Sequence, residues 1–148
     1  MLKRMLVIAV LPFCLYSTIA RTADTADASP EEVVRAYTEA ANRHDLEAFL
    51  ALYASGIRKF RFPGELTSEG IEHNRAVYSK AFPAAPNLKI EILELFAVED
   101  KVVVHDRVTG RPDGKTADEI TVYQVQAGRI TNIVYVEQKV RDGVQETR

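Results

Sequence analysis

The second half of the chain most constrains the fold, because it holds four consecutive β-rich segments. They read LKIEILELFAV, KVVVHDRVTG, DEITVYQVQ and RITNIVYVEQ, at residues 88–98, 101–110, 118–126 and 129–138. Short polar stretches, ED, RPDG and AG, separate them and are typical of hairpin turns. Four strands joined this way predict an antiparallel sheet, and such a sheet buries one face under other elements.

The first half of the chain predicts helices that can cover this sheet. Ser29 and Glu32 form a capping box before an apolar stripe at helical spacing that includes Tyr37. Asp45 is a good cap for a second helix, on which we place Tyr53. A strand at 57–62 and a third helix from Ser68 to Phe82 follow. This order predicts an α+β fold, in which three helices close a cone-shaped, curved antiparallel sheet around a pocket.

The N-terminal residues have the layout of a secretory signal peptide. A short basic start precedes the apolar run LVIAVLPFCLYSTIA, which is too short for a membrane-spanning helix and contains Pro12. We expect a signal peptide at 1–20, a linker at 21–28, the folded domain at 29–138 and a tail at 139–148. Cleavage after Ala20 is preferred, and Ala28 is a second site. The mature protein is then secreted or periplasmic, with no membrane association.

Composition excludes several classes of function. The 148 residues, 47% of them apolar, suffice for one domain with its own core. Losing Lys3 and Arg4 with the signal peptide reduces 19 basic residues to 17 against 21 acidic ones, a net charge of −4. That balance disfavours nucleic acid as a partner. Cleavage also removes Cys14, so the mature domain has no disulfide and no thiol nucleophile.

Three stretches resemble the nuclear transport factor 2-like superfamily, in its SnoaL-like and ketosteroid isomerase-like branches. They are VVRAYTEAANRHDLEAFLALYA, EGIEHNRAVYSKAFP and VEDKVVVHDRVTG with AGRITNIVYVEQ, and the resemblance runs from Ser29 to Gln138. It implies the cone fold predicted above. It leaves the function open, because this scaffold serves isomerases, cyclases, dehydratases and binding modules without catalysis.

The isomerase branch implies a pocket that this chain only partly retains. Its oxyanion-donating tyrosine falls on Tyr37, and its two supporting tyrosines fall on Tyr53 and Tyr78; the alternative is that all three belong to the core. Its catalytic carboxylate falls on Arg61, and its second oxyanion donor falls near Thr121. A guanidinium cannot take a proton, so we expect no steroid isomerisation by that mechanism. Arg61 is then expected to face the pocket.

Two further carboxylates are candidate site residues. SnoaL-like cyclases use an aspartate of the sheet as acid and base, and Asp106 is the nearest match, although His105–Asp106 is also compatible with a surface pair. Glu137 occupies a last-strand position next to Arg61 in the isomerase pocket, so we predict an Arg61–Glu137 ion pair. The alternative is that Glu137 turns outward and Gln138 inward.

Other features favour small-molecule binding without a cofactor. Glu69 and His73 are four residues apart, a spacing that can hold a metal, but polar residues at a helix start are more typical of a solvated face, so no metal is expected. We expect a pocket for an apolar ligand with a carbonyl or anionic end. One alternative is a cofactor-independent acid/base enzyme with relocated catalytic residues. Another is a domain whose pocket is filled by its own side chains and binds no ligand.

We also expect a homodimer. It would form through the outer face of the sheet, with contacts by Val103, Val122 or Ile133.

Overall fold

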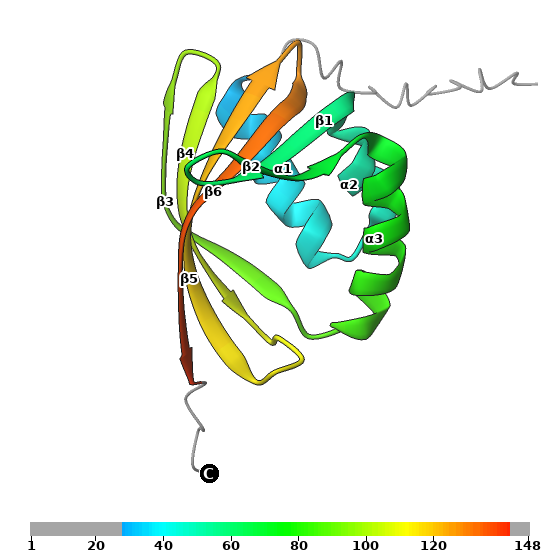
Figure 1. Ribbon diagram of the computed structural model, residues 1–148, viewed down its shortest axis with the longest axis vertical. Helices are drawn as coiled ribbons and strands as arrows, with labels where there is room; N and C mark the ends of the chain where they lie inside the picture. The colour runs from blue at the N-terminus through cyan, green and yellow to red at the C-terminus, as the bar shows by residue number, and fades with distance from the viewer. Residues whose placement is uncertain (1–27, 143–148) are drawn as a thin grey trace, which may run out of the picture.

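The computed structural model describes residues 28–142, which form three helices and six strands (Figure 1). In chain order these are α1 (Pro30–Asn42), α2 (Leu46–Ala51), β1 (Tyr53–Arg61), β2 (Glu65–Glu69), α3 (Ile71–Ala84), β3 (Lys89–Val98), β4 (Lys101–Thr109), β5 (Lys115–Gln126) and β6 (Arg129–Asp142). The expected signal peptide and the linker up to residue 27 lie outside the described residues. No helix within the described residues has the length and apolar character needed to cross a membrane.

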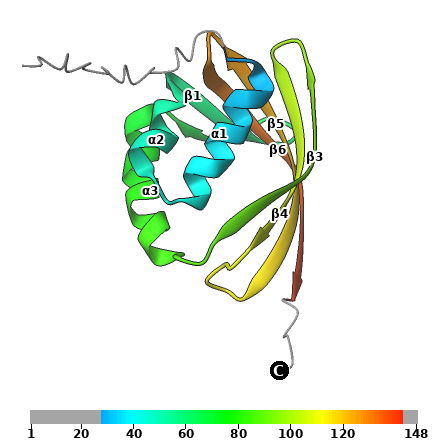
Figure 2. The same ribbon diagram turned by 180° about the vertical axis from the view of Figure 1, so that it is seen from behind.

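The six strands form one open, strongly curved sheet in the order β2-β1-β6-β5-β4-β3. The helices lie together on its concave side, as the front and back views show (Figures 1 and 2). This arrangement confirms the α+β fold. Two details differ from the expectation: β1 pairs with β6 in parallel, so the sheet is mixed, and β2 is an additional strand. The Pro63-Gly64 turn allows β2 to fold back on β1 as a hairpin.

The first two helices begin directly after Ser29 and Asp45, the residues that the sequence predicted as their N-caps. The Ser29 N–H donates to the Glu32 side chain at 2.8 Å and the Glu32 N–H donates to Ser29 Oγ at 3.3 Å, completing the capping box. The Asp45 side chain caps α2 through the Ala48 N–H. However, α2 ends at Ala51, and Tyr53 is the first residue of β1, paired with Ile130 of β6. Pairing with β6 therefore overrides the helical pattern that extended to Tyr53.

The third helix begins at Ile71, three residues later than predicted. Gly70 precedes it with a φ of 84°, a conformation that glycine adopts without steric cost. The buried Asn74 side chain donates to the Gly70 carbonyl oxygen at 2.8 Å and to Ser68 Oγ at 3.3 Å. These contacts fix the start of α3 against the end of β2.

The hydrophobic core lies between α1, α2 and the concave face of the sheet. Helix α1 packs across β3, β4, β5 and β6, and its buried stripe is the one that the sequence predicted. The core is completed by alternate residues of the strands. Its largest fully buried apolar side chains are Phe49, Leu50, Ile57, Ile130, Ile133, Val33, Val34, Val102 and Val104.

A β-bulge in β6 changes which side chains face the helices. Thr121 of β5 is opposite Tyr135, whereas Ile120 is opposite Glu137, so Val136 is an extra residue between the two pairs. A bulge bends the strand and shifts the alternation of side chains by one residue. Beyond Val136 the inward position is therefore that of Gln138. The strand continues to Asp142, past the expected end at 138.

The convex face of the sheet carries an apolar row that crosses five strands. Strand pairing aligns Phe96, Val103, Val122, Val134 and Phe60 from β3 to β1. Two residues expected on this face, Val103 and Val122, are part of the row. The expectation for Ile133 was wrong, because its side chain is fully buried in the core and its neighbour Val134 occupies the outer face.

Candidate functional site

A cavity of about 270 Å³ lies between the helices and the concave face of the sheet. The helices contribute aromatic side chains to its wall, among them Tyr37, Phe49 and Tyr78. The sheet contributes a column of polar groups from the middle strands, above all Asp106 and Thr121. An apolar cavity with a few convergent polar groups is the usual architecture of a small-molecule site.

Asp106 is a buried carboxyl group in the wall of this cavity. It alternates with Val104 and Val108 on the inner face of β4, is 5% exposed, and its Oδ1 has no hydrogen-bond partner. Burial raises the pKa of Asp106 to about 7, and the negative charge of Glu119 contributes further. The surface-pair alternative therefore does not hold, since Asp106 faces the cavity with a proton affinity suited to exchange near neutral pH.

Two of the predicted tyrosines form a buried pair. The hydroxyl groups of Tyr37 and Tyr53 lie 2.9 Å apart, and the Tyr37 ring stacks on Phe49. Burial raises the pKa of both phenols well above the usual value, so both are neutral and can donate or accept hydrogen bonds. Tyr37 lines the cavity, whereas Tyr53 is not in its wall and supports Tyr37 from behind.

The middle of β5 lines the cavity at every second residue. Glu119, Thr121 and Tyr123 all lie in its wall, and Thr121 is only 1% exposed. Cross-strand pairing puts Glu119 directly opposite Asp106 on the same face, so the two carboxyl groups are neighbours. The predicted inward position of Thr121 is confirmed. The same alternation along β5 turns Glu119 and Tyr123 inward, and these two residues were not predicted from the sequence.

Arg61 lies at the rim of the cone instead of inside the cavity. It is paired with Tyr135 of β6, but its side chain is 68% exposed and contacts Glu65 at 3.4 Å. The expectation that Arg61 faces the inner pocket was therefore wrong. The buried cation of β1 is Lys59, two residues earlier, which is 4% exposed. Lys59 and Arg61 lie on the same face of β1, as the alternation of side chains along a strand predicts, but only Lys59 lies under the helices.

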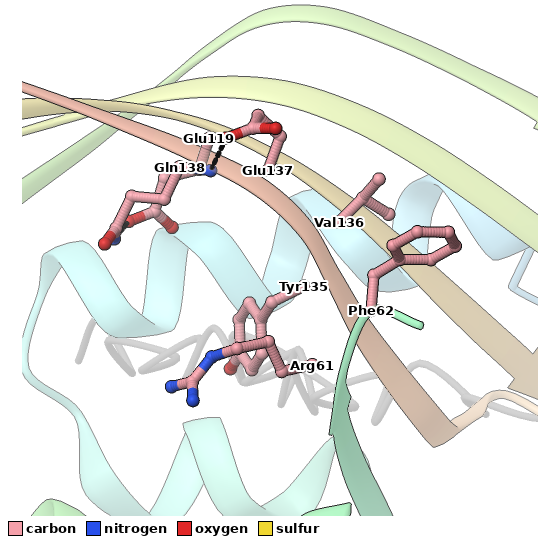
Figure 3. A pocket seen from close by; sticks show the side chains of 7 residues that line it. All are labelled: Arg61, Phe62, Glu119, Tyr135, Val136, Glu137 and Gln138. Atoms are coloured by element: carbon pink, nitrogen blue, oxygen red, sulfur yellow. Dashed lines mark hydrogen bonds between the residues drawn. The ribbon is translucent and has the colours of Figure 1, made fainter. Parts of the chain in front are cut away.

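An outer groove of about 490 Å³ lies beside the end of β1, next to the cavity (Figure 3). Glu119 and Tyr135 line both the groove and the cavity, so they separate the two spaces. The groove is completed by Arg61, Phe62, Val136, Glu137 and Gln138.

The predicted Arg61–Glu137 ion pair does not form. Both residues line the groove, but the guanidinium of Arg61 and the carboxylate of Glu137 point apart (Figure 3). The bulge at Val136 is the cause, because it puts Glu137 opposite the exposed Ile120 and turns Gln138 inward. Gln138 donates from its side-chain nitrogen to Glu119. The alternative orientation of these two residues was thus correct.

The described residues offer no obvious metal centre. No group of three or more histidine, cysteine, aspartate or glutamate side chains within 28–142 is arranged to hold a metal ion. Glu69 ends β2 and His73 lies in the first turn of α3, and both are exposed. Among the described residues, Glu69 and His73 therefore do not belong to a cluster of three or more metal-binding side chains.

Comparison with known proteins places the chain among small α+β domains. The family profile described as SnoaL-like domain matches residues 34–133. No curated protein matches the chain by sequence. A solved structure of an uncharacterized cystatin-fold protein from Novosphingobium aromaticivorans has a TM-score of 0.68 at 22% identity, covering 74% of this chain and 99% of that one.

Two other solved structures carry provisional names that mention an activity. A provisionally named SnoaL-like polyketide cyclase from Jannaschia sp. CCS1 has a TM-score of 0.62 at 19% identity, covering 74% of this chain and 85% of that one. A provisionally named ketosteroid isomerase from Kribbella flavida has a TM-score of 0.61 at 16% identity, covering 80% of this chain and 82% of that one. At these identities the likeness shows the fold.

Proposed function

Because the chain belongs to the SnoaL-like domain family, we propose that its cavity binds a small, largely apolar ligand bearing a carbonyl oxygen and that Asp106 exchanges a proton with that ligand. The observation that carries this proposal is the Asp106 carboxyl group, which is buried in the cavity wall with Oδ1 unpaired. A buried polar atom without a partner is costly, so its retention is explained if a bound ligand supplies the partner.

The chemistry proposed is acid/base catalysis without a cofactor. A general base works best when its pKa is near the operating pH, and the pKa of Asp106 is raised to about 7. Its carboxylate takes a proton from a carbon next to the ligand's carbonyl, and the resulting acid returns the proton at another position. Isomerisation, cyclisation and dehydration are all reactions of this type, and two of the structural neighbours carry provisional names of the first two kinds.

The size of the cavity limits the ligand. Pockets for drug-sized ligands span roughly 300–1,000 Å³. The inner cavity, at about 270 Å³, is therefore suited to a ligand of one or two rings. The isomerase mechanism of the family is not proposed, because the position of its base is held by Arg61 at the exposed rim.

Hydrogen–deuterium exchange tests the proposal without knowledge of the natural ligand. Small ketones such as 2-tetralone and 1-indanone are incubated with the protein in D₂O, and loss of their α-proton signals is followed by NMR. The wild-type protein is expected to accelerate exchange, and Asp106→Asn to reduce the acceleration by about 10²–10⁴-fold. Asp142→Asn, an exposed carboxyl group on β6, is the matched control. Exchange that is absent, or unaffected by Asp106→Asn, contradicts the proposal.

A second candidate function is ligand binding without turnover. It is favoured by the 2.9 Å contact between the Tyr37 and Tyr53 hydroxyl groups. One of the two phenolic protons is used in the hydrogen bond between them, so that proton is not donated to a ligand oxygen. Native mass spectrometry of the protein purified from its host distinguishes the two functions. A co-purified ligand that remains chemically unchanged after long incubation supports binding alone, whereas conversion of that ligand supports catalysis.

A further inference from the structure

Lys59 is a buried cation that the proposed proton transfer does not use. It lies on the inner face of β1 after Ile57 and is 4% exposed, although its neighbours Arg58 and Arg61 are exposed. No ion pair joins Lys59 to a carboxylate within residues 28–142. An ammonium group removed from water without a counter-ion is costly, and burial correspondingly lowers the pKa of Lys59. Its position therefore requires an explanation.

The partners of Lys59 are two aromatic rings and one hydroxyl group. Its Nζ lies 5.0 Å from the ring centroid of Tyr53 and 4.5 Å from that of Tyr78, so both contacts are cation–π interactions. Nζ also donates a hydrogen bond to the Tyr78 hydroxyl oxygen at 2.8 Å. The ammonium thus lies behind the tyrosine that α3 contributes to the cavity wall.

This hydrogen bond determines the direction in which the Tyr78 hydroxyl can act. An ammonium group has donors only, so the phenol oxygen is the acceptor and its own proton must point elsewhere. Tyr78 lines the cavity beside Tyr135. The pKa of Tyr135 is raised by burial first, and the charge of Tyr78 and a side-chain hydrogen bond with Tyr78 contribute further. The proton of Tyr78 therefore points away from Lys59, where Tyr135 or a ligand oxygen in the cavity can accept it, and the positive charge behind it strengthens that donation.

We infer that Lys59 is a positioning residue which, through its hydrogen bond to Tyr78, makes that hydroxyl a dedicated donor to a carbonyl or enolate oxygen of the bound ligand. The inference rests on the proposed function and specifies where the ligand's oxygen lies, at the Tyr78 end of the cavity. When Asp106 removes a proton beside the carbonyl, negative charge moves to that oxygen. A preorganised donor backed by a cation stabilises such a charge.

The test compares two probes that differ only in the oxygen. 2-Acetylnaphthalene and 2-ethylnaphthalene are titrated into wild type, Lys59→Met, Tyr78→Phe and the double variant, with fluorescence as the readout. Methionine is close in shape to lysine and replaces the buried charge with an apolar group, which proteins generally tolerate. Lys80→Met is the matched control, because Lys80 is an exposed lysine on the same helix as Tyr78.

Wild type and Lys80→Met are expected to bind the acetyl probe about tenfold more tightly than the ethyl probe. Lys59→Met is expected to retain the affinity for the ethyl probe and to reduce the preference to about twofold or less. Tyr78→Phe is expected to do the same, and the double variant to lose nothing further, since Lys59 acts through Tyr78.

Several results would overturn the inference. They are an unchanged preference in Lys59→Met, an equal loss of affinity for both probes, additive losses in the double variant, or no binding of either probe. The two proposals fail separately, because the probes require no turnover. If Asp106→Asn leaves ketone exchange unaffected, the probe preference still tests Lys59. If the preference is independent of Lys59 while exchange depends on Asp106, only the role of Lys59 is refuted.

Discussion

The buried carboxyl group of Asp106 predicts an unusual dependence of stability on pH. In the unfolded chain this group loses its proton near its ordinary pKa of 3.8, whereas in the folded protein it does so at about 7. Between those values only the unfolded state releases the proton. The folded state is therefore progressively destabilised as the pH rises from about 4 to about 7, and the loss is complete above that range.

The size of the effect follows from the pKa difference. Each pKa unit corresponds to about 1.4 kcal/mol, so the shift from 3.8 to about 7 costs the folded protein at most about 4 kcal/mol at pH 8. Asp106→Asn removes the ionisation and retains the shape of the side chain. The quantity to compare is the free energy of unfolding of the variant minus that of wild type. This difference should be up to about 4 kcal/mol larger at pH 8 than at pH 4.

Urea denaturation at half-unit pH intervals measures this difference. Asp142→Asn, which changes an exposed carboxyl group on β6, is the control and should show no such trend. Only the change with pH is diagnostic, because the amide adds a constant offset from its own buried polar atoms. A difference between wild type and Asp106→Asn that stays constant from pH 4 to pH 8 would refute the reasoning.

Four further outcomes are expected. Ultraviolet assays of steroid enone formation should show no activity above background, and Arg61→Ala should not alter that result because its guanidinium lies at the exposed rim. N-terminal sequencing of the mature protein should begin near residue 21 or 29; a retained Met1 contradicts export. Sedimentation at micromolar concentration should show a homodimer, which Val122→Glu dissociates; a monomeric wild type contradicts it. Asn42→Ala should cost about 1–3 kcal/mol in urea denaturation, because the Asn42 side chain pairs with both backbone groups of Ile90, at 2.7 and 2.8 Å.

Local signals in the sequence predicted most of the fold. The Ser29 and Asp45 caps, the helical apolar stripe and the four-strand meander all depend on residues close together in the chain, and each was confirmed. The assignment of Tyr53 could not be predicted because it depends on distant pairing: Tyr53 belongs to β1 because β6, far along the chain, pairs with it. The β1–β2 hairpin is local, since the Pro63-Gly64 turn joins its two strands, and it was missed for a different reason: β2 is short and almost entirely exposed, so it shows no apolar alternation.

The family resemblance located part of the site. It indicated Asp106 and Thr121 as pocket residues, with a surface pair as the alternative for Asp106, and both residues lie in the cavity wall. Arg61 was assigned to the pocket although the chain leaves the helical cover between Lys59 and Arg61, a boundary that no sequence pattern marks. Glu137 was misplaced because a single extra residue precedes it. The ligand-binding and catalytic roles of these residues remain predictions.

The bulge at Val136 affects how this strand can be aligned with relatives. The two parts of β6 on either side of it follow different side-chain phases, since Tyr135 faces inward and so does Gln138, three residues later. In a relative whose last strand is regular, inward residues recur at every second position. A gapless alignment anchored on the inward residues Ile133 and Tyr135 would therefore equate Glu137 with an inward residue of that relative. A one-residue gap at Val136 restores the correspondence, and assignments of function beyond this point in the strand should be transferred only across that gap.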